Sequence, residues 1–418
     1  MAAADDRPLA GQPWLDAPAS RKVVTALEAD GRPARFVGGC VRDALLGLPA
    51  ADELDLATPE RPERVIALLE AADLPAIPTG LAHGTVTTIA DRCRFEITTL
   101  RRDVACDGRH AEVAFTDDFK VDAARRDFTL NAMSCDRAGR LYDYFGGRAD
   151  LAAGRVRFVG DAAARIREDY LRILRFFRFF ARYGGEPADA EALAACRAAA
   201  PELGRLSGER IQTEMLKLLK APNPLPALRL MAETRVLAEV AFGPVALGRL
   251  ADLIALAPNS DALVRLAALL RPPTAAPEAA ERVAERWRLS NRDAERLLAL
   301  TREPLLRLDA APAEWRRDLH RLGKQRFVDL ARLAAAEAGG SAGAALADAL
   351  AEARDWQPRR LPVGGDDLMA LGVAPGPPLG ALLAALEAWW VARDFAPDRA
   401  ACLAEARRLV ASDGDAGS

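Results

Sequence analysis

The chain has 418 residues, half of them hydrophobic and only 6% aromatic, and its formal net charge is -3. A chain of this length can bury the cores of about two to four domains, and its abundant Ala, Leu, Arg and Glu favour a mostly helical protein. The small net charge excludes a globally basic nucleic-acid-binding protein, so any RNA contact must use a local basic patch.

Further features of the sequence indicate in which compartment the protein acts and which metal sites it lacks. No uninterrupted apolar run reaches about 18 residues, so neither a membrane-spanning helix nor a membrane partner is expected. The six Cys and three His are scattered without a CxxC pair, which argues against a structural zinc site. The polar N-terminal segment is unlike a secretory signal peptide, and reduced thiols fit a cytoplasmic protein.

A strand, a tight turn, a helix and a second strand are predicted between residues 35 and 58. The turn contains Gly38 and Gly39, which lack a Cβ and therefore let backbone N–H groups approach a phosphate closely. Glu53 and Asp55 are two residues apart on the second strand, so their side chains share one face. Carboxylates in this position can hold a divalent cation against the phosphates of a nucleotide. The glycine pair alone also fits a simple turn, and the acidic pair alone also fits a solvated surface. Together they supply the phosphate site and the metal ligands that nucleotidyl transfer needs.

The neighbouring segments add a third acidic residue. Helices are expected at 14–30, before this unit, and at 61–72, after it. Alternating β-branched and polar residues from 75 to 102 predict a hairpin. On the second strand of that hairpin, Glu96 projects opposite to its two apolar neighbours. It either completes a metal site or is an exposed strand residue.

Two polar segments follow the hairpin. Residues 104–120 contain Gly and few apolar residues, which predicts a mobile loop with a short strand at 112–115. Residues 122–133 are predicted to be helical, with two adjacent arginines and further polar residues ahead of an apolar end. A solvated helix face is the simplest interpretation of that polar content.

From residue 155 onward the pattern is nearly all helical, and 155–182 is rich in arginine. The arginines that follow Asp169 recur every three or four residues and therefore line one helix face. That face either meets solvent or binds the phosphates of a nucleotide or RNA. Asp169 and Arg172, one turn apart, offer an acceptor and a donor fork that can pair with the Watson–Crick edge of a base. The alternative is an ordinary ion pair within the helix.

Several separate motifs closely resemble those of the class II tRNA nucleotidyltransferases (CCA-adding enzymes) and the related bacterial poly(A) polymerases. They are GGCVRD with the later DLAT, FEITTLRRD, RRDFTLNAM, EDYLRILRFFRF and SGERI, between residues 35 and 220. The resemblance implies an α+β fold, with a small polymerase-β-like head containing a mixed or antiparallel sheet, then an all-α neck, body and tail. The implied domains are the head with its lead helix at 1–150, the neck with the nucleotide-selecting helix at 151–225, the body at 226–355 and a tRNA-binding tail at 356–418.

The resemblance also implies roles for individual residues. Gly38, Gly39 and Arg42 would hold the nucleotide triphosphate. Glu53 and Asp55 would be catalytic ligands of Mg²⁺, with Glu96 a third catalytic carboxylate. The other nucleotide-binding residues would be Arg126, Asp127 and Asn131 at the ribose and phosphates, and Asp169, Arg172 and Arg175 at the base.

The acidic motif departs from the family at one position. The family usually has Asp-x-Asp before Leu-Ala-Thr, whereas this chain has Glu53-Leu54-Asp55, preceded by Asp52. Residues i and i+2 of a strand share a face and residues i and i+3 do not, which favours Glu53 with Asp55 as the metal ligands. A β-bulge at this point would restore Asp52 as the first ligand instead.

The implied activity is addition of CCA to the 3′ end of tRNA from CTP and ATP by two-metal phosphoryl transfer, with the tRNA acceptor arm as the macromolecular partner. The head motifs fit a poly(A) polymerase or an enzyme that adds only A equally well. The altered acidic motif also leaves open a catalytically inactive RNA-binding module. Protein partners are unknown from the sequence.

Overall fold

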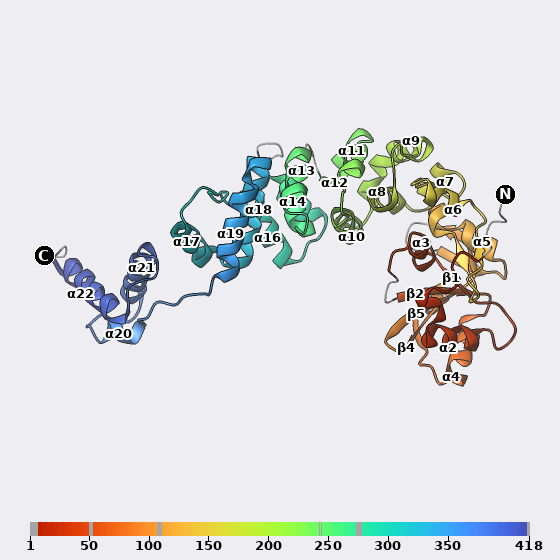
Figure 1. Cartoon of the computed structure of the whole chain (residues 1–418), viewed down its shortest axis with the longest axis horizontal. Coiled ribbons are helices and arrows are strands. Elements are labelled where there is room, and N and C mark those ends of the chain that lie inside the picture. The colour runs from red at the N-terminus through yellow and green to blue at the C-terminus, as the bar shows by residue number, and fades with distance from the viewer. Residues whose placement is uncertain are drawn as a thin grey trace. The chain divides into compact units, whose positions relative to one another are not determined.

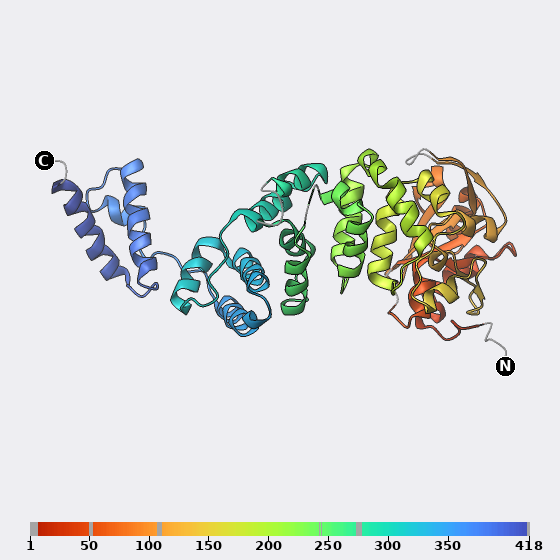
Figure 2. The ribbon, with the colours of Figure 1, turned by 90° about the horizontal axis from the view of Figure 1, so that it is seen from above.

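The computed structural model describes residues 7–49, 53–106, 111–241, 243, 245–272 and 278–415. The chain divides into two compact units, Met1–Pro244 with Arg282–Leu289, and Val245–Glu281 with Ser290–Ser418. The first unit contains the β-sheets, and the second is built from helices (Figures 1 and 2). The predicted α+β fold class is therefore confirmed. Within the described ranges, no helix is long and apolar enough to cross a membrane.

The centre of the first unit is a seven-stranded mixed sheet with the order β3-β4-β5-β2-β1-β8-β9. The strands are β1 (Arg35–Val37), β2 (Glu53–Thr58), β3 (Ile77–Gly80), β4 (Thr85–Ala90), β5 (Cys93–Thr99), β8 (Ser134–Cys135) and β9 (Leu141–Tyr142). β2 and β5 pair in parallel, and the other neighbours are antiparallel. Alternate residues of the central strands, such as Phe36, Leu56 and Phe95, are fully buried, which fixes the register of the sheet.

The predicted strand–turn–helix–strand unit is present as β1, α3 (Gly39–Leu45) and β2. The predicted hairpin is also confirmed, because β4 and β5 pair around residues 91 and 92. The helix predicted at 61–72 is α4 (Pro62–Ala71). The helix predicted at 14–30 is instead two helices, α1 (Pro13–Asp16) and α2 (Pro18–Leu27). Ala17 between them has ψ 141° because a residue before proline is disfavoured in the helical region.

The mobile loop predicted at 104–120 is wrong for the described residues. A separate two-stranded sheet forms there from β6 (Arg101–Cys106) and β7 (Ala111–Phe115), followed by α5 (Phe119–Ala124). The two strands satisfy each other's backbone hydrogen-bonding groups, which a polar composition does not reveal. The short strand expected within this segment corresponds to β7.

The helix predicted at 122–133 is also wrong beyond α5. Only a single 3-10 turn, η2 (Thr129–Asn131), follows, and Phe128 before it is extended. Phe128 is fully buried against Phe158 and Phe179, with ring centroids at 4.9 and 5.2 Å. Tertiary packing of this ring therefore overrides the local helical preference. After β9 comes α6 (Gly147–Ala152).

The helices that follow cover residues 162–241 and are α7 (Ala162–Glu168), α8 (Leu171–Tyr183), α9 (Ala190–Ala199), α10 (Gly208–Leu219), α11 (Leu225–Glu233) and α12 (Val236–Ala241). α8 packs on α10 and α11. Its buried face includes Phe176 and Phe177, which are fully buried, and Phe176 stacks on Phe158. Phe158 in turn packs against Phe128, which follows α5. This aromatic cluster holds α8 against the sheet-containing part of the unit. Ser207 stands at the N-cap of α10, but its side chain makes no capping hydrogen bond there.

The remaining helices are α13 (Leu247–Leu256), α14 (Ala262–Leu270), α15 (Ala279–Arg286), α16 (Asn291–Arg302), α17 (Pro312–Leu322), α18 (Lys324–Ala338), α19 (Gly343–Asp355), α20 (Gly365–Met369), α21 (Pro377–Ala392) and α22 (Arg399–Asp415). α18 packs on α13, α17 and α19. Buried Arg249 donates hydrogen bonds to the carbonyl oxygens of Ala268 and Arg271, which satisfies orphan groups at the end of α14.

Candidate functional site

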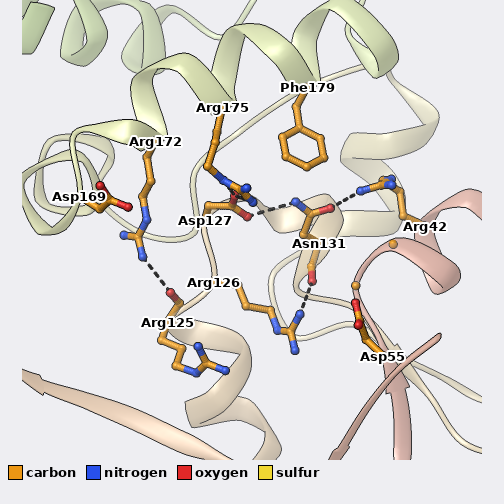
Figure 3. Close-up of a pocket in the computed structure, with 12 residues that line it drawn as sticks. Arg42, Asp55, Arg125, Arg126, Asp127, Asn131, Asp169, Arg172, Arg175 and Phe179 are labelled. Atoms are coloured by element: carbon orange, nitrogen blue, oxygen red, sulfur yellow. Dashed lines mark hydrogen bonds and ion pairs between the residues drawn. The ribbon is translucent and has the colours of Figure 1, made fainter. Parts of the chain in front are cut away.

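One cavity of about 360 Å³ in the first unit is lined by residues from the glycine turn at 38–39, from β2 and from the start of α8 (Figure 3). Its walls come from the Gly38–Gly39 turn, α3, β2, the segment around η2, and α8. The lining residues are Gly38, Gly39, Arg42, Asp55, Arg125, Arg126, Asp127, Asn131, Asp169, Arg172, Arg175 and Phe179. Ten of these were predicted from sequence, and Arg125 and Phe179 were not. Glu53 and Glu96 are not among the lining residues, and Asp52 lies outside the described residues.

The glycine turn is closely approached by charged side chains at the point where a side chain of its own would stand. Gly38 has φ +73°, a conformation that residues with a Cβ rarely adopt. A Cβ on Gly38 would lie 3.3 Å from Nη1 of Arg126 and 3.7 Å from Oδ2 of Asp55. The turn therefore needs glycine both for its conformation and for the close approach of a guanidinium and a carboxylate.

The acidic residues lie on the paired strands β2 and β5. Asp55 is directly opposite Glu96, and Glu53 is opposite Arg94. Desolvation by the surrounding protein atoms and the nearby negative charge of Glu96 raise the pKa of Asp55 to about 6, although Arg126 acts against the rise. Arg94 places its Nε 3.2 Å from Glu53 and its Nη2 3.9 Å from Glu96. The exposed pattern of β2 confirms that Glu53 and Asp55 share one face.

The carboxylates of Asp55 and Glu96 are candidate ligands for a divalent metal ion. Across the described parts of the chain, no group of three or more His, Cys, Asp or Glu residues is arranged to hold a metal ion by itself. Asp55 and Glu96 are, however, close enough for mutual repulsion, which a divalent cation would relieve. Magnesium is commonly bound by one or two carboxylates together with substrate phosphates, and this donor set fits that mode of binding.

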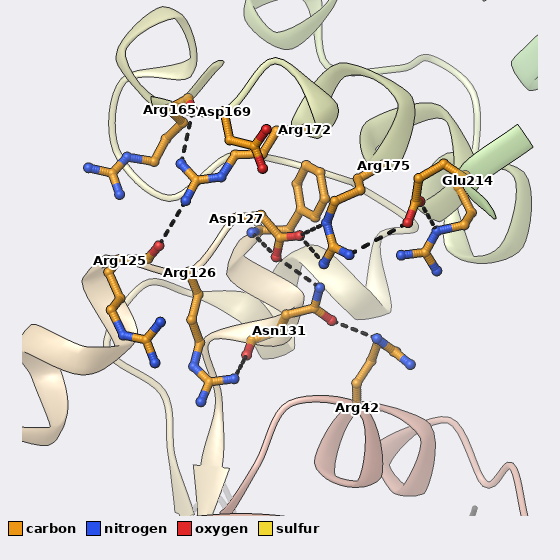
Figure 4. A network of polar contacts seen from close by, with 12 residues as sticks. Arg42, Arg125, Arg126, Asp127, Asn131, Arg165, Asp169, Arg172, Arg175 and Glu214 are labelled. Carbon is orange, nitrogen blue, oxygen red and sulfur yellow. Dashed lines mark hydrogen bonds and ion pairs between the residues drawn. The ribbon is translucent and has the colours of Figure 1, made fainter. Parts of the chain in front are cut away.

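A chain of polar contacts crosses the cavity with Asp127 at its centre (Figure 4). Asp127 is buried and accepts hydrogen bonds from Nε of Arg175 at 2.7 Å and from Nδ2 of Asn131 at 3.1 Å. Asn131 in turn accepts from Nη1 of Arg42 at 2.6 Å. Burial alone would raise the pKa of Asp127, but the charge of Arg175 and these hydrogen bonds hold it below its ordinary value. Asp127 is therefore ionised at neutral pH, and the network links α8 to α3.

The network continues beyond the cavity to α10. Glu214, only 4% exposed, accepts a hydrogen bond from Nε of Arg178 at 2.5 Å and lies 3.9 Å from Nη1 of Arg175. Glu214 follows the SGERI motif, but no site role was predicted for it from the sequence. The available signal was an acidic residue on the side of the 208–219 segment that a helical pattern would bury, and Glu214 lies on the buried face of α10.

Asp169 and Arg172 both line the cavity, but they do not form the ordinary ion pair considered from sequence. Asp169 accepts a hydrogen bond from Nη2 of Arg210 at 2.6 Å. Arg172 donates from Nη1 to Glu168 at 2.5 Å and from Nη2 to the backbone oxygen of Arg125 at 3.2 Å. Separate partners thus fix the acceptor and the donor fork beside each other. That is an arrangement able to read the edge of a base.

Comparison with protein families matches two parts of the chain. Residues 34–157 match the poly A polymerase head domain. Residues 189–242 match a domain described as the probable RNA and SrmB-binding site of polymerase A. The first match contains the glycine turn, the acidic strands, Asp127 and Asn131, and the second contains Glu214. Arg175 on α8 lies between the two matched ranges.

Individual relatives point the same way. The chain is 46% identical over 202 residues to CCA tRNA nucleotidyltransferase 1, mitochondrial, of Danio rerio, in a match covering 48% of this chain and 47% of that protein. It is 40% identical over 214 residues to the CCA-adding enzyme of Geobacillus thermodenitrificans, covering 51% of this chain and 52% of that protein. The chain therefore spans about half the length of these curated relatives in the sequence matches.

Solved structures extend the likeness over nearly the whole chain. The crystal structure of the Bacillus stearothermophilus CCA-adding enzyme in complex with CTP aligns with a TM-score of 0.75 and 28% identity. That alignment covers 96% of this chain and 99% of the other. The Thermotoga maritima CCA-adding enzyme complexed with tRNA-CCA aligns with a TM-score of 0.65 at 20% identity, which shows a shared fold.

Proposed function

We propose that this chain is a member of the family of class II tRNA nucleotidyltransferases and bacterial poly(A) polymerases, to which its head motifs and fold are similar. On that premise, it adds CCA to the 3′ end of tRNA, using CTP and ATP without a nucleic-acid template. The observation that carries the proposal is the single cavity that joins the glycine turn, Asp55 and the start of α8. A site for triphosphate, a catalytic carboxylate and a base-reading pair in one cavity is what untemplated nucleotide selection requires.

Each part of the cavity has a role in this proposal. Gly38, Gly39 and Arg42 bind the triphosphate, and Arg126, Asp127 and Asn131 bind or position the ribose and phosphates. Asp169 accepts from the exocyclic amine of C or A, while Arg172 donates to a ring acceptor, with Arg175 held beside them by Asp127. Because these partners are fixed within the protein, nucleotide choice does not depend on a paired strand.

The acidic strands supply the metal site. We propose that Asp55 holds Mg²⁺ together with Glu53 or Glu96 and the nucleotide phosphates, and that Asp52 remains the rival for Glu53. When bound, the cation supplies activation of the RNA 3′-hydroxyl and charge neutralisation on the pyrophosphate leaving group. Asp55 itself must be ionised for this. Its pKa is raised first by desolvation and then by the negative charge of Glu96, and a bound cation would offset both by favouring the ionised form.

The helical remainder is proposed to hold tRNA by shape and phosphate contacts at its acceptor arm, with neck, body and tail at 151–225, 226–355 and 356–418. We also propose that the protein acts in the cytoplasm. The Danio rerio relative carries a mitochondrial name, so localisation by fluorescence or fractionation is the appropriate check.

The deciding experiment is primer extension on three tRNAs that end before CCA, after C and after CC. CTP and ATP are supplied separately and together with Mg²⁺, and Asp55→Ala serves as the inactive control. Stepwise addition of C, C and A that then stops supports the proposal. Addition of A to the CC-ended tRNA alone would identify an A-adding enzyme, and long A tails on any RNA would identify a poly(A) polymerase. Absence of extension with all substrates would point to an inactive RNA-binding module.

A further inference from the structure

Tyr183, the last residue of α8, contacts the arginine that the proposed function assigns to the triphosphate. Its hydroxyl donates a hydrogen bond to Oδ1 of Asp43 at 2.9 Å. The same carboxylate oxygen accepts from Nε of Arg42, also at 2.9 Å. The Tyr183 ring lies 4.3 Å from Cζ of Arg42, within range of a cation–π contact. Tyr183 thus holds Arg42 twice, once through Asp43 and once through its ring.

The hydroxyl of Tyr183 is suited to remain a donor. Burial raises the pKa of Tyr183, and the negative charge of Asp43 adds to the rise, while Arg42 acts against it. The phenol therefore keeps its proton at neutral pH and donates to Asp43. Asp43 is 140 residues away in the sequence, so local pattern does not predict this contact.

Arg42 is consequently fixed on several sides. It is only 7% exposed, and its Nη1 donates to Asn131 while its Nε donates to Asp43. Its Nη2 lies 3.6 Å from the point where a Cβ on Gly39 would stand. The two contacts at Nε and Nη1 leave Nη2 directed to the glycine turn, where the proposed function places the triphosphate.

The same helix carries the base-reading residues at its other end. α8 runs from Leu171 to Tyr183, with Arg172 in its first turn and Asp169 two residues before its start. A helix of 13 residues spans about 20 Å. Its buried Phe side chains make it a rigid element. A displacement of α8 near Arg172 therefore also moves Tyr183 relative to Asp43 and Arg42.

We propose that Tyr183 is a positioning residue for nucleotide binding, which orients Arg42 towards the triphosphate. Through Tyr183, the orientation of Arg42 depends on the position of the helix that reads the base. This inference rests on the proposed function, because it takes the cavity to be a nucleoside triphosphate site. Tyr183 does not line the cavity itself and acts through Asp43 and Arg42.

The test compares binding of CTP with binding of CMP, which has the same base and ribose but lacks the β- and γ-phosphates. Tyr183→Phe removes the hydrogen bond and keeps the ring, and Tyr183→Leu removes both. Tyr142→Phe is the matched control, because its hydroxyl also donates to an aspartate, Asp136, at 3.1 Å and its ring also stacks on an arginine, Arg35. Tyr142 is not among the cavity-lining residues.

We expect Tyr183→Phe to weaken CTP binding by about tenfold, the loss of one hydrogen bond to a charged group, and to leave CMP binding unchanged. Tyr183→Leu should weaken CTP binding further, and Tyr142→Phe should change neither ligand. In an Arg42→Met background the effect of Tyr183→Phe should disappear, because Tyr183 acts through Arg42. Retained CMP binding shows that each variant has folded.

Three results would overturn the inference while the wild-type protein still binds CTP and extends tRNA. They are unchanged CTP binding in both Tyr183 variants, equal losses for CTP and CMP, and additive effects of Tyr183→Phe and Arg42→Met. A wild-type protein that binds no CTP at all would instead reject the proposed function and the inference with it.

Discussion

Replacing Asp127 by Asn tests whether the buried polar network stabilises the head. The change removes a carboxylate that accepts from Arg175 and Asn131 and leaves the Arg175 charge with one weaker partner, Glu214 at 3.9 Å. Breaking a fully buried ion pair costs about 3–5 kcal/mol. Because the Arg175 side chain is 32% exposed, solvent replaces part of the lost interaction, and we expect a loss of about 2 kcal/mol in the free energy of unfolding.

The measurement is urea unfolding followed by pulsed hydrogen exchange and mass spectrometry of peptides from β1 and β2, which report on the head alone. Asp30→Asn is the matched control, because Asp30 forms an equally short pair with Arg64, at 2.6 Å, on the surface of the same head. Exposed pairs contribute little, so this control should not change the unfolding midpoint measurably.

The pH dependence gives the same prediction a second test. The pKa of Asp127 is below its unfolded-state value of 3.8, so its stabilisation is present above pH 3.8 and is lost as the pH falls through the lower folded-state pKa. The difference between wild type and Asp127→Asn should therefore be constant near neutral pH and shrink on acidification below pH 3.8. Equal midpoints for Asp127→Asn and Asp30→Asn at pH 7.5, or a difference that grows on acidification, would refute the reasoning.

Four further substitutions test other parts of the site and fold. Asp55→Asn should reduce tRNA extension by more than about a hundredfold without lowering the melting temperature, and retained activity would remove Asp55 from the chemistry. Asp169→Ala should reduce discrimination of CTP and ATP against UTP and GTP by about tenfold or more in single-turnover assays, and unchanged selectivity would contradict base reading at α8. Gly147→Ala should destabilise the head by about 2 kcal/mol, because its Cβ would stand 2.2 Å from a backbone oxygen of η2. Gly248→Ala, with open space at its Cβ, should instead stabilise α13 by about 0.5 kcal/mol, and thermal unfolding shifts of the same sign would count against this packing argument.

Much of the fold and cavity was predictable from the sequence because the relevant signals are local. The Gly38–Gly39 turn lies between a short apolar run and an apolar helix, and Glu53 and Asp55 share a face by strand alternation alone. The helical spacing after Asp169 likewise predicts α8. These residues line one cavity in the structure, except Glu53, which is not among the lining residues.

Local signals failed where packing decided the backbone. The predicted helix at 122–133 ends early because Phe128 is drawn into the aromatic cluster on α8. The polar segment at 104–120 forms strands because β6 and β7 supply each other's hydrogen bonds. In both cases the stabilising partner is a surface or strand that exists only after folding.

The amino-acid sequence by itself determined the strand–turn–helix–strand unit, the face shared by Glu53 and Asp55, and the arginine face of α8. Only the tertiary structure decided which partners hold those groups: Arg210 for Asp169, Asp127 for Arg175, and Tyr183 through Asp43 for Arg42. The physical reason is that periodicity specifies which way a side chain points from its own helix or strand. The distance and charge of its partner depend on how separately formed elements pack together.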